Sequence, residues 1–159
     1  MTFSVVDTNV PIVANNHAPQ ASLDCVSACI RELETLVNSG TVVLDNGNLI
    51  LNEYISELGF SGQPGPGSAF VKWIWDNQGY VDKCEKVDIT ENKDRVFTEF
   101  PDEPALKDFH KDDRKFVAVA LKSANNPEIL NAVDSDWWNY REVFMRCGIR
   151  VRFLCRQVS

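Results

Sequence analysis

The sequence predicts an α/β fold, a three-layer α/β/α sandwich around a central, mainly parallel sheet. Short apolar runs typical of buried strands alternate along the chain with longer segments whose apolar residues recur at helical spacing. Two of the apolar runs end directly in acidic residues, as strands do at the site-bearing edge of open α/β sheets. The 159 residues contain no repeat, low-complexity tract or linker, so we expect a single domain over residues 1–159.

The expected strands are short and rich in β-branched residues. The clearest is residues 3–6, which is followed at once by the polar group Asp7-Thr8-Asn9. A second run is closed by the turn Asp45-Asn46-Gly47. The full set of expected strands is 3–6, 41–44, 80–89 (weakly), 129–133 and 149–154.

Helices are expected between these strands. In the first, Leu23, Val26, Ile30 and later apolar residues share one helical face, Ser22 is suited to cap the start, and Gly40 lies where the helix should end. The remaining expected helices are 49–58, 68–77, 113–122 and 137–146, whereas 59–67 and 90–110 look irregular.

Composition restricts the class of protein. Apolar residues make up 44% and charged residues 25%, a globular profile, and no apolar run approaches the roughly 20 residues of a membrane helix. The N-terminus lacks the basic region of a signal peptide, so we expect a cytoplasmic protein without a membrane partner. The net charge of −7 disfavours a nucleic-acid binder unless several acids gather at one place and hold metal ions.

The five cysteines are odd in number and form no CxxC pair. This pattern argues against a disulfide framework and against a cysteine-rich zinc site. Cys25 and Cys29 share one face of an expected helix, where a metal pair is conceivable but buried structural cysteines are favoured.

Acidic residues from four separate elements are expected at one edge of the sheet. Asp7 and Asp134 follow strands, Asp113 opens a helix, and Glu53 lies in the helix after the second strand. Two carboxylates about 4 Å apart repel by about 4 kcal/mol at an effective dielectric constant of about 20, so the group requires protons or cations. All-oxygen ligands select Mg²⁺ or Mn²⁺, which in pairs can promote phosphodiester hydrolysis.

In their order, these segments resemble the motifs of PIN (PilT N-terminal) domain nucleases. Residues 5–10 (Val-Val-Asp-Thr-Asn-Val) are similar to the opening motif of the family, and residues 51–54 (Leu-Asn-Glu-Tyr) to its second acidic position. Residues 113–120 resemble the third, an Asp opening an alanine-rich helix, and residues 133–137 the fourth. The resemblance covers nearly the whole chain, although residues 59–110 carry little of the pattern.

The resemblance implies a Mg²⁺- or Mn²⁺-dependent endoribonuclease that uses a metal-activated water and leaves a 5′-phosphate and a 3′-hydroxyl. It makes Asn9 a residue that positions the first Asp or a substrate phosphate. Four basic residues surround the third acid and are candidates for holding the RNA backbone: Lys107, Lys111, Arg114 and Lys115. The resemblance also implies catalytic, metal-binding roles for four acids and an accessory metal-binding role for a fifth, which are Asp7, Glu53, Asp113, Asp134 and, as the accessory acid, Asp136.

The chain departs from the family at two places. Ala132 stands where PIN toxins commonly have Thr or Ser. Asp112 beside Asp113 makes the third position ambiguous by one residue, and we choose Asp113 because its spacing to Phe116 and Ala118 fits the family helix better. Trp137, directly after the fourth motif, is the best candidate for stacking on a base.

Several roles and partners remain open at this stage. An RNA substrate is expected, and the nuclease types include a toxin held by an antitoxin and a processing or defence enzyme with another regulatory protein; a homodimer is also left open. The alternatives are a catalytically inactive PIN scaffold that binds protein or RNA, and an aspartate-based phosphatase. The phosphatase normally needs a second Asp where this chain has Asn9, and a phospho-acceptor receiver domain with Asp45 as acceptor lacks a matching Lys.

Overall fold

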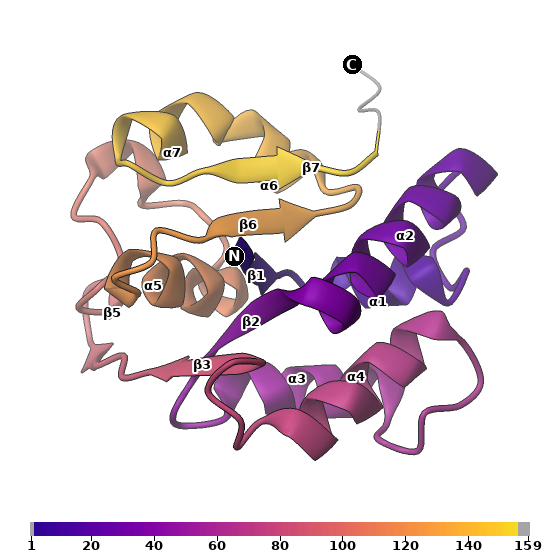
Figure 1. Ribbon diagram of the computed structural model, residues 1–159. Coiled ribbons are helices and arrows are strands. Elements are labelled where there is room, and N and C mark those ends of the chain that lie inside the picture. The colour runs from indigo at the N-terminus through magenta and orange to yellow at the C-terminus, as the bar shows by residue number, and fades with distance from the viewer. Residues whose placement is uncertain (1, 156–159) are drawn as a thin grey trace.

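The computed structural model, which describes residues 2–155, contains a five-stranded parallel sheet. Each hydrogen-bonded pair of strands in this sheet is parallel, so the expected sheet is confirmed. The strand order is β3-β2-β1-β6-β7, so the first strand lies in the centre (Figure 1). The bounds are β1 (Thr2–Val6), β2 (Gly40–Asp45), β3 (Cys84–Val87), β6 (Glu128–Asn131) and β7 (Val151–Phe153).

Helices cover both faces of the sheet, which confirms the three-layer arrangement (Figure 1). Helices α1, α2 and α4 pack against one another, and α2 contacts β1 and β2. Helix α5 packs on β1, β2 and β6, and α7 packs on β7. The helices are α1 (Asn9–Ala14), α2 (Leu23–Ser39), α3 (Leu49–Leu58), α4 (Pro66–Asn77), α5 (Arg114–Lys122), α6 (Ser135–Asn139) and α7 (Arg141–Arg146).

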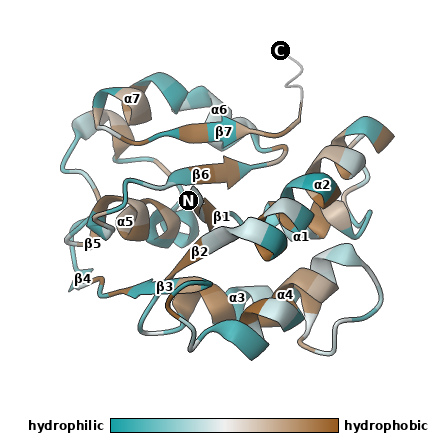
Figure 2. Cartoon of the chain, viewed as in Figure 1, coloured by the Kyte–Doolittle hydropathy of each residue, from teal (hydrophilic) through white to brown (hydrophobic). Residues whose placement is uncertain are grey.

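The core forms where the sheet meets these helices. Val5 and Val6 of β1 point to opposite faces and both are fully buried, as expected for a central parallel strand. In Figure 2 the hydrophobic colour falls on much of the sheet and on stretches of the helices around it. Ser22 caps α2 by accepting a hydrogen bond from the backbone N–H of Cys25 at 3.1 Å, as its position predicts.

The structure differs from the expected elements in three places. Residues 9–14, for which no helix or strand was expected, form helix α1. The expected helix 137–146 is divided at Tyr140 into α6 and α7, because Trp137, Tyr140 and Phe144 all pack around the ring of Phe109. The irregular segment contains a small antiparallel pair, β4 (Glu91–Asn92) with β5 (Val96–Phe97), and two 3₁₀ turns, η1 (Pro104–Leu106) and η2 (Lys111–Asp113).

The expectation that the cysteines form no disulfide is wrong. Cys25 on α2 is bonded to Cys155, and the two Cα atoms are 4.9 Å apart although 130 residues separate them in sequence. The spacing of cysteines in the sequence identifies pairs that are close along the chain. Cys25 and Cys155 are brought together only because the chain returns toward α2 after β7. Within residues 2–155, no helix has the length and apolar content needed to cross a membrane.

Candidate active site

The candidate site lies beside β1, where the order in which strands are added to the sheet reverses. From β1 the chain builds β2 and β3 on one side, and later β6 and β7 on the other. Ligand sites in open α/β sheets form at such a switch point, beside the carboxyl ends of the strands. The backbone N–H of Asp7, the first residue after β1, donates to the carbonyl of Leu130 in β6 at 3.0 Å. This bond fastens Asp7 at the switch point.

Asp7 is a buried carboxylate with one unused oxygen. The residue is only 4% exposed, and its Oδ2 accepts a hydrogen bond from the backbone N–H of Asn9 at 2.9 Å. Its Oδ1 is buried and has no hydrogen-bond partner within residues 2–155. Burial raises the pKa of Asp7 well above its usual value, and the charges of Asp113, Asp134 and Glu53 raise it further. The four expected acids therefore act on one another electrostatically.

The structure places Asp113, not Asp112, in this acidic group. Asp113 is half-buried, and burial together with the charges of Asp134 and Glu53 raises its pKa to about 6, against the opposing charges of His110 and Lys115. The side chain of Asp112 is 83% exposed, and its carboxylate lies 4.0 Å from the His110 ring. The one-residue ambiguity is thus resolved in position, although the metal-binding role of Asp113 stays a prediction.

Glu53 joins the group from α3 and already has a cationic partner. Its Oε1 lies 2.7 Å from Lys115 Nζ, and its Oε2 accepts a hydrogen bond from the Thr8 hydroxyl. The next residue, Tyr54, donates from its hydroxyl to the carbonyl of Val6 and so ties α3 to the end of β1. Thr8 and Tyr54 also belong to this site, and no sequence pattern indicated this, although Thr8 is adjacent to Asp7.

Asp134 and Asp136 lie after β6. Asp134 caps α6, since its Oδ1 accepts a hydrogen bond from the backbone N–H of Asp136 at 2.9 Å. Burial raises the pKa of Asp134, and the charge of Asp136 adds to this effect. The side chain of Asp136 is exposed, so its expected accessory role depends on an ion at the solvent edge of the group.

Asn9 holds the two strand ends together. Its Oδ1 accepts a hydrogen bond from the backbone N–H of Ala132 at 3.0 Å, across 123 residues of sequence. The bond uses the backbone of Ala132, so the absence of a Thr or Ser side chain at this position does not weaken it. A positioning role for Asn9 agrees with this contact, whereas a phosphate contact stays a prediction.

Two expected substrate contacts are not supported. Arg114 is 4% exposed, and its guanidinium donates inward to the carbonyls of Leu106, Lys107 and Phe109 at 2.9–3.1 Å. It holds the segment before α5 in place, and these donors are used inside the protein. Trp137 is fully buried among the aromatic rings, so it cannot stack on a base in this conformation.

Lys115, the other expected RNA-binding cation, is also buried, but within the acidic group. Its ammonium offsets part of the negative charge there through Glu53. Of the four basic residues near the third acid, Lys107 and Lys111 are the exposed ones.

The spacing of the carboxylates limits how they can hold an ion. Among the described residues, the one set of three ligand atoms that all lie within 4.8 Å of one another consists of cysteines, not of the four acids. Octahedral Mg²⁺ binds oxygen at about 2.1 Å and usually keeps several waters, taking one or two carboxylates directly. The oxygen donors and the unused buried Oδ1 of Asp7 suit a hard cation, and since no three carboxylates of the described residues offer oxygens that close together, such an ion would be held by one or two carboxylates with water as the remaining ligands.

A groove of about 880 Å³ reaches one of the four acids, Asp134. Its walls include Asn9 and Asp134 from the site, and Cys25 and Cys155 from the disulfide.

Comparisons of the chain with protein-family models, with curated proteins and with solved structures find no match. The resemblance to PIN domains accordingly stays a prediction.

Asp45, which follows β2, has a structural role that bears on one alternative. It is buried, and its two carboxylate oxygens accept hydrogen bonds from the backbone N–H groups of Leu49 and Ile50 at 2.8 and 2.9 Å. An acceptor Asp of a receiver domain must present a free oxygen to a phosphoryl group. The use of both oxygens to cap α3 counts against that function.

Proposed function

We propose that this protein is a metal-dependent nuclease that hydrolyses RNA with Mg²⁺ or Mn²⁺. The observation that carries the proposal is Asp7, a buried carboxylate with an unused oxygen among three further acids. Such a group is unfavourable unless a cation or protons offset its charge. Asp45, which follows the neighbouring strand, has both carboxylate oxygens paired with backbone donors, whereas Oδ1 of Asp7 is one of several buried polar atoms without a donor among the described residues.

Each site residue has a part in this proposal. Asp7, Asp113 and Asp134 would hold the ions, directly or through water, and Asp136 would contact an ion from the exposed side. Glu53 would take part when Lys115 shifts from its carboxylate. When bound, the ions supply the Lewis acidity that activates water and stabilises the leaving oxygen of a phosphodiester.

The chain itself positions these groups. The Asn9 bridge to Ala132 and the Asp7 bond to Leu130 fix the ends of β1 and β6 against each other. Fixed ligands cost little reorganisation during the reaction, which is what phosphoryl-group chemistry requires of a protein. The exposed Lys107 and Lys111 are the cations we expect to meet the RNA backbone.

Two rival activities receive less support. An aspartate-based phosphatase needs a second acid where Asn9 stands, and the Asn9 side chain is already used to join two strand ends. An inactive scaffold would be expected to lose acids, whereas all four are present in one place. A cytoplasmic location, and regulation as a toxin by an antitoxin or as a defence or processing enzyme by another protein, belong to the proposal as expectations.

The test is incubation of the full chain with labelled single-stranded RNA, structured RNA and DNA, with Mg²⁺, Mn²⁺ or EDTA. We expect RNA cleavage that requires the metal and leaves 5′-phosphate and 3′-hydroxyl ends. Asp7→Asn should abolish cleavage, whereas the matched control Asp112→Asn, at an exposed position, should retain it. Cleavage that persists in EDTA, or equal activity in Asp7→Asn, would refute the proposal.

A further inference from the structure

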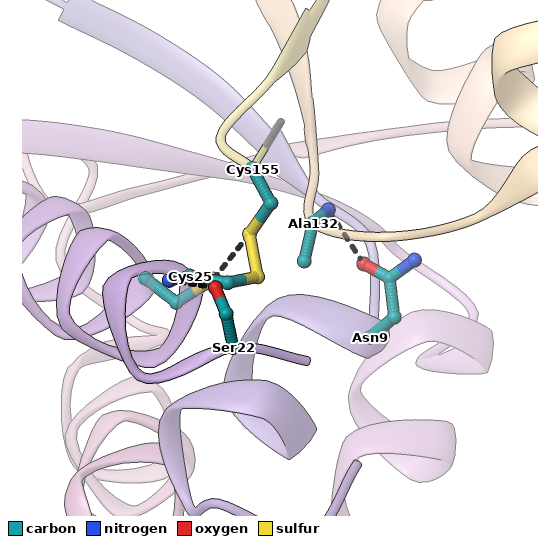
Figure 3. Close-up of a disulfide and its surroundings, with 6 residues drawn as sticks. Asn9, Ser22, Cys25, Ala132 and Cys155 are labelled. Atoms are coloured by element: carbon teal, nitrogen blue, oxygen red, sulfur yellow. Dashed lines mark hydrogen bonds between the residues drawn. A yellow bond between two sulfur atoms is a disulfide. The ribbon is translucent and has the colours of Figure 1, made fainter. Parts of the chain in front are cut away.

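A second group of potential metal ligands lies outside the acidic site. Cys25 and Cys29 are on α2, and Cys155 follows β7; all three are buried. Their three sulfur atoms lie within 4.8 Å of one another, and Cys29 Sγ is 4.0 Å from Cys155 Sγ. Figure 3 shows Cys25 and Cys155 approaching each other from these two segments, close to the Asn9–Ala132 hydrogen bond.

We propose that, when the Cys25–Cys155 disulfide is reduced, the three cysteines bind a Zn²⁺ ion as thiolates. Tetrahedral Zn²⁺ binds sulfur at about 2.3 Å, which places two sulfur ligands about 3.8 Å apart. The 4.0 Å between Cys29 and Cys155 is close to this value. The bonded sulfurs of Cys25 and Cys155 must separate after reduction, and side-chain rotation allows this at the present Cα distance of 4.9 Å.

The zinc site forms from the disulfide in two steps. A dithiol reductant of the cell transfers two electrons and two protons to the disulfide, giving two thiols, and becomes a disulfide itself. Zn²⁺ then replaces the three thiol protons, which are released to water. Disulfides are rare in the reducing cytosol, so the metal-bound state is the form we expect if the protein is cytoplasmic.

The third cysteine, Cys29, is buried and lies near Glu32. Burial and the nearby charge of Glu32 raise the pKa of this thiol to about 12, so it is a poor nucleophile for exchange with the adjacent disulfide. The groove lined by Cys25 and Cys155 gives an ion a route from solvent and leaves room for water as a fourth ligand. Thiolate ligands select Zn²⁺ over the hard ions expected at the carboxylates.

The experiment uses the full chain, reduced and freed of metal under anaerobic conditions, and titrated with Co²⁺ as a spectroscopic probe and then with Zn²⁺. We expect a near-ultraviolet thiolate-to-cobalt charge-transfer band that saturates at one ion per chain and is lost when Zn²⁺ displaces Co²⁺. Oxidised protein, with Cys29, Cys84 and Cys147 as its free thiols, should show no such band.

Variants separate this site from others. Cys29→Ser should abolish the band while retaining the Cys25–Cys155 disulfide under oxidising conditions, so circular dichroism of the oxidised variant confirms its fold. Cys84→Ser, which alters a buried cysteine on β3 outside the group, should retain the band. Asp7→Asn should also retain it, because carboxylates give no such band. Absence of the band in the reduced wild type, or its persistence in Cys29→Ser, would overturn the proposal.

Discussion

Replacing Asp113 with Asn tests the electrostatics of the acidic group separately from catalysis. The pKa of Asp113 rises from 3.8 to about 6 in the folded protein. Each pKa unit corresponds to about 1.4 kcal/mol, so ionised Asp113 destabilises the folded state by up to about 3 kcal/mol. This is an upper limit, because water partly screens a half-buried group.

The sign of the effect follows from the direction of the pKa shift. Because the folded state binds this proton more tightly than the unfolded chain, the penalty grows as pH rises from 3.8 and is complete above about 6. In EDTA at about pH 8, Asp113→Asn should therefore be more stable than the wild type by up to about 3 kcal/mol. At about pH 4 the difference should shrink to less than about 1 kcal/mol.

Urea denaturation followed by tryptophan fluorescence measures both values. In melting experiments, the larger difference corresponds to roughly 6–12 °C for a chain of this size. Asp112→Asn is the matched control, because it removes the same charge from an exposed neighbouring position, and it should change neither value. An equal gain at both pH values, or the same gain in Asp112→Asn, would contradict the assignment of Asp113 to the acidic group.

Three further perturbations address the same site. At about pH 8, Mg²⁺ at 100 times its dissociation constant should stabilise the wild type by about 2.7 kcal/mol in calorimetry, and a shift of equal size in Asp7→Asn would exclude Asp7 as a ligand. Lys115→Met leaves Glu53 half-buried without its cation, so it should cost about 1–3 kcal/mol in EDTA and less with Mg²⁺; unchanged stability in EDTA would argue against this pairing. Arg114→Met should cost at least about 3 kcal/mol in thermal melts, because several buried carbonyls lose their donor; a stable variant with only a raised KM for RNA would instead support the original substrate role.

The sheet and the edge that carries the acids were predictable because both follow from local rules. A parallel strand buried on both faces must be apolar, and the first polar residue after it must lie at the carboxyl edge. Asp7 lies at this edge as the first residue after β1, and Asp134 acts on it electrostatically although β6 ends earlier than expected, at Asn131. The order of the neighbouring strands then brought Glu53 and Asp113 into electrostatic range.

The roles of individual side chains depended on tertiary contacts that spacing does not encode. Arg114 and Lys115 are adjacent and similar in sequence, yet one is bonded to carbonyls of the 106–109 segment and the other to an acid on α3. Which direction each side chain takes is set by the irregular segment before α5, whose path no periodicity describes. The disulfide was missed for the same reason, since Cys155 returns to α2 only after the last strand.

Asn9 joins two strand ends at the site with a side chain that carries no charge. Its amide oxygen accepts the hydrogen bond from Ala132 that joins the ends of β1 and β6, and a carboxylate there could accept the same bond. A carboxylate, however, would add another negative charge two residues from Asp7, whose pKa is already raised by burial and by three other acids. A neutral amide keeps the bridge without this cost, so the remaining negative charge stays on residues that can face an ion. Asn at this position therefore joins the two strand ends without adding to the repulsion around Asp7, and it also leaves the chain without the second acid that a phosphatase would need.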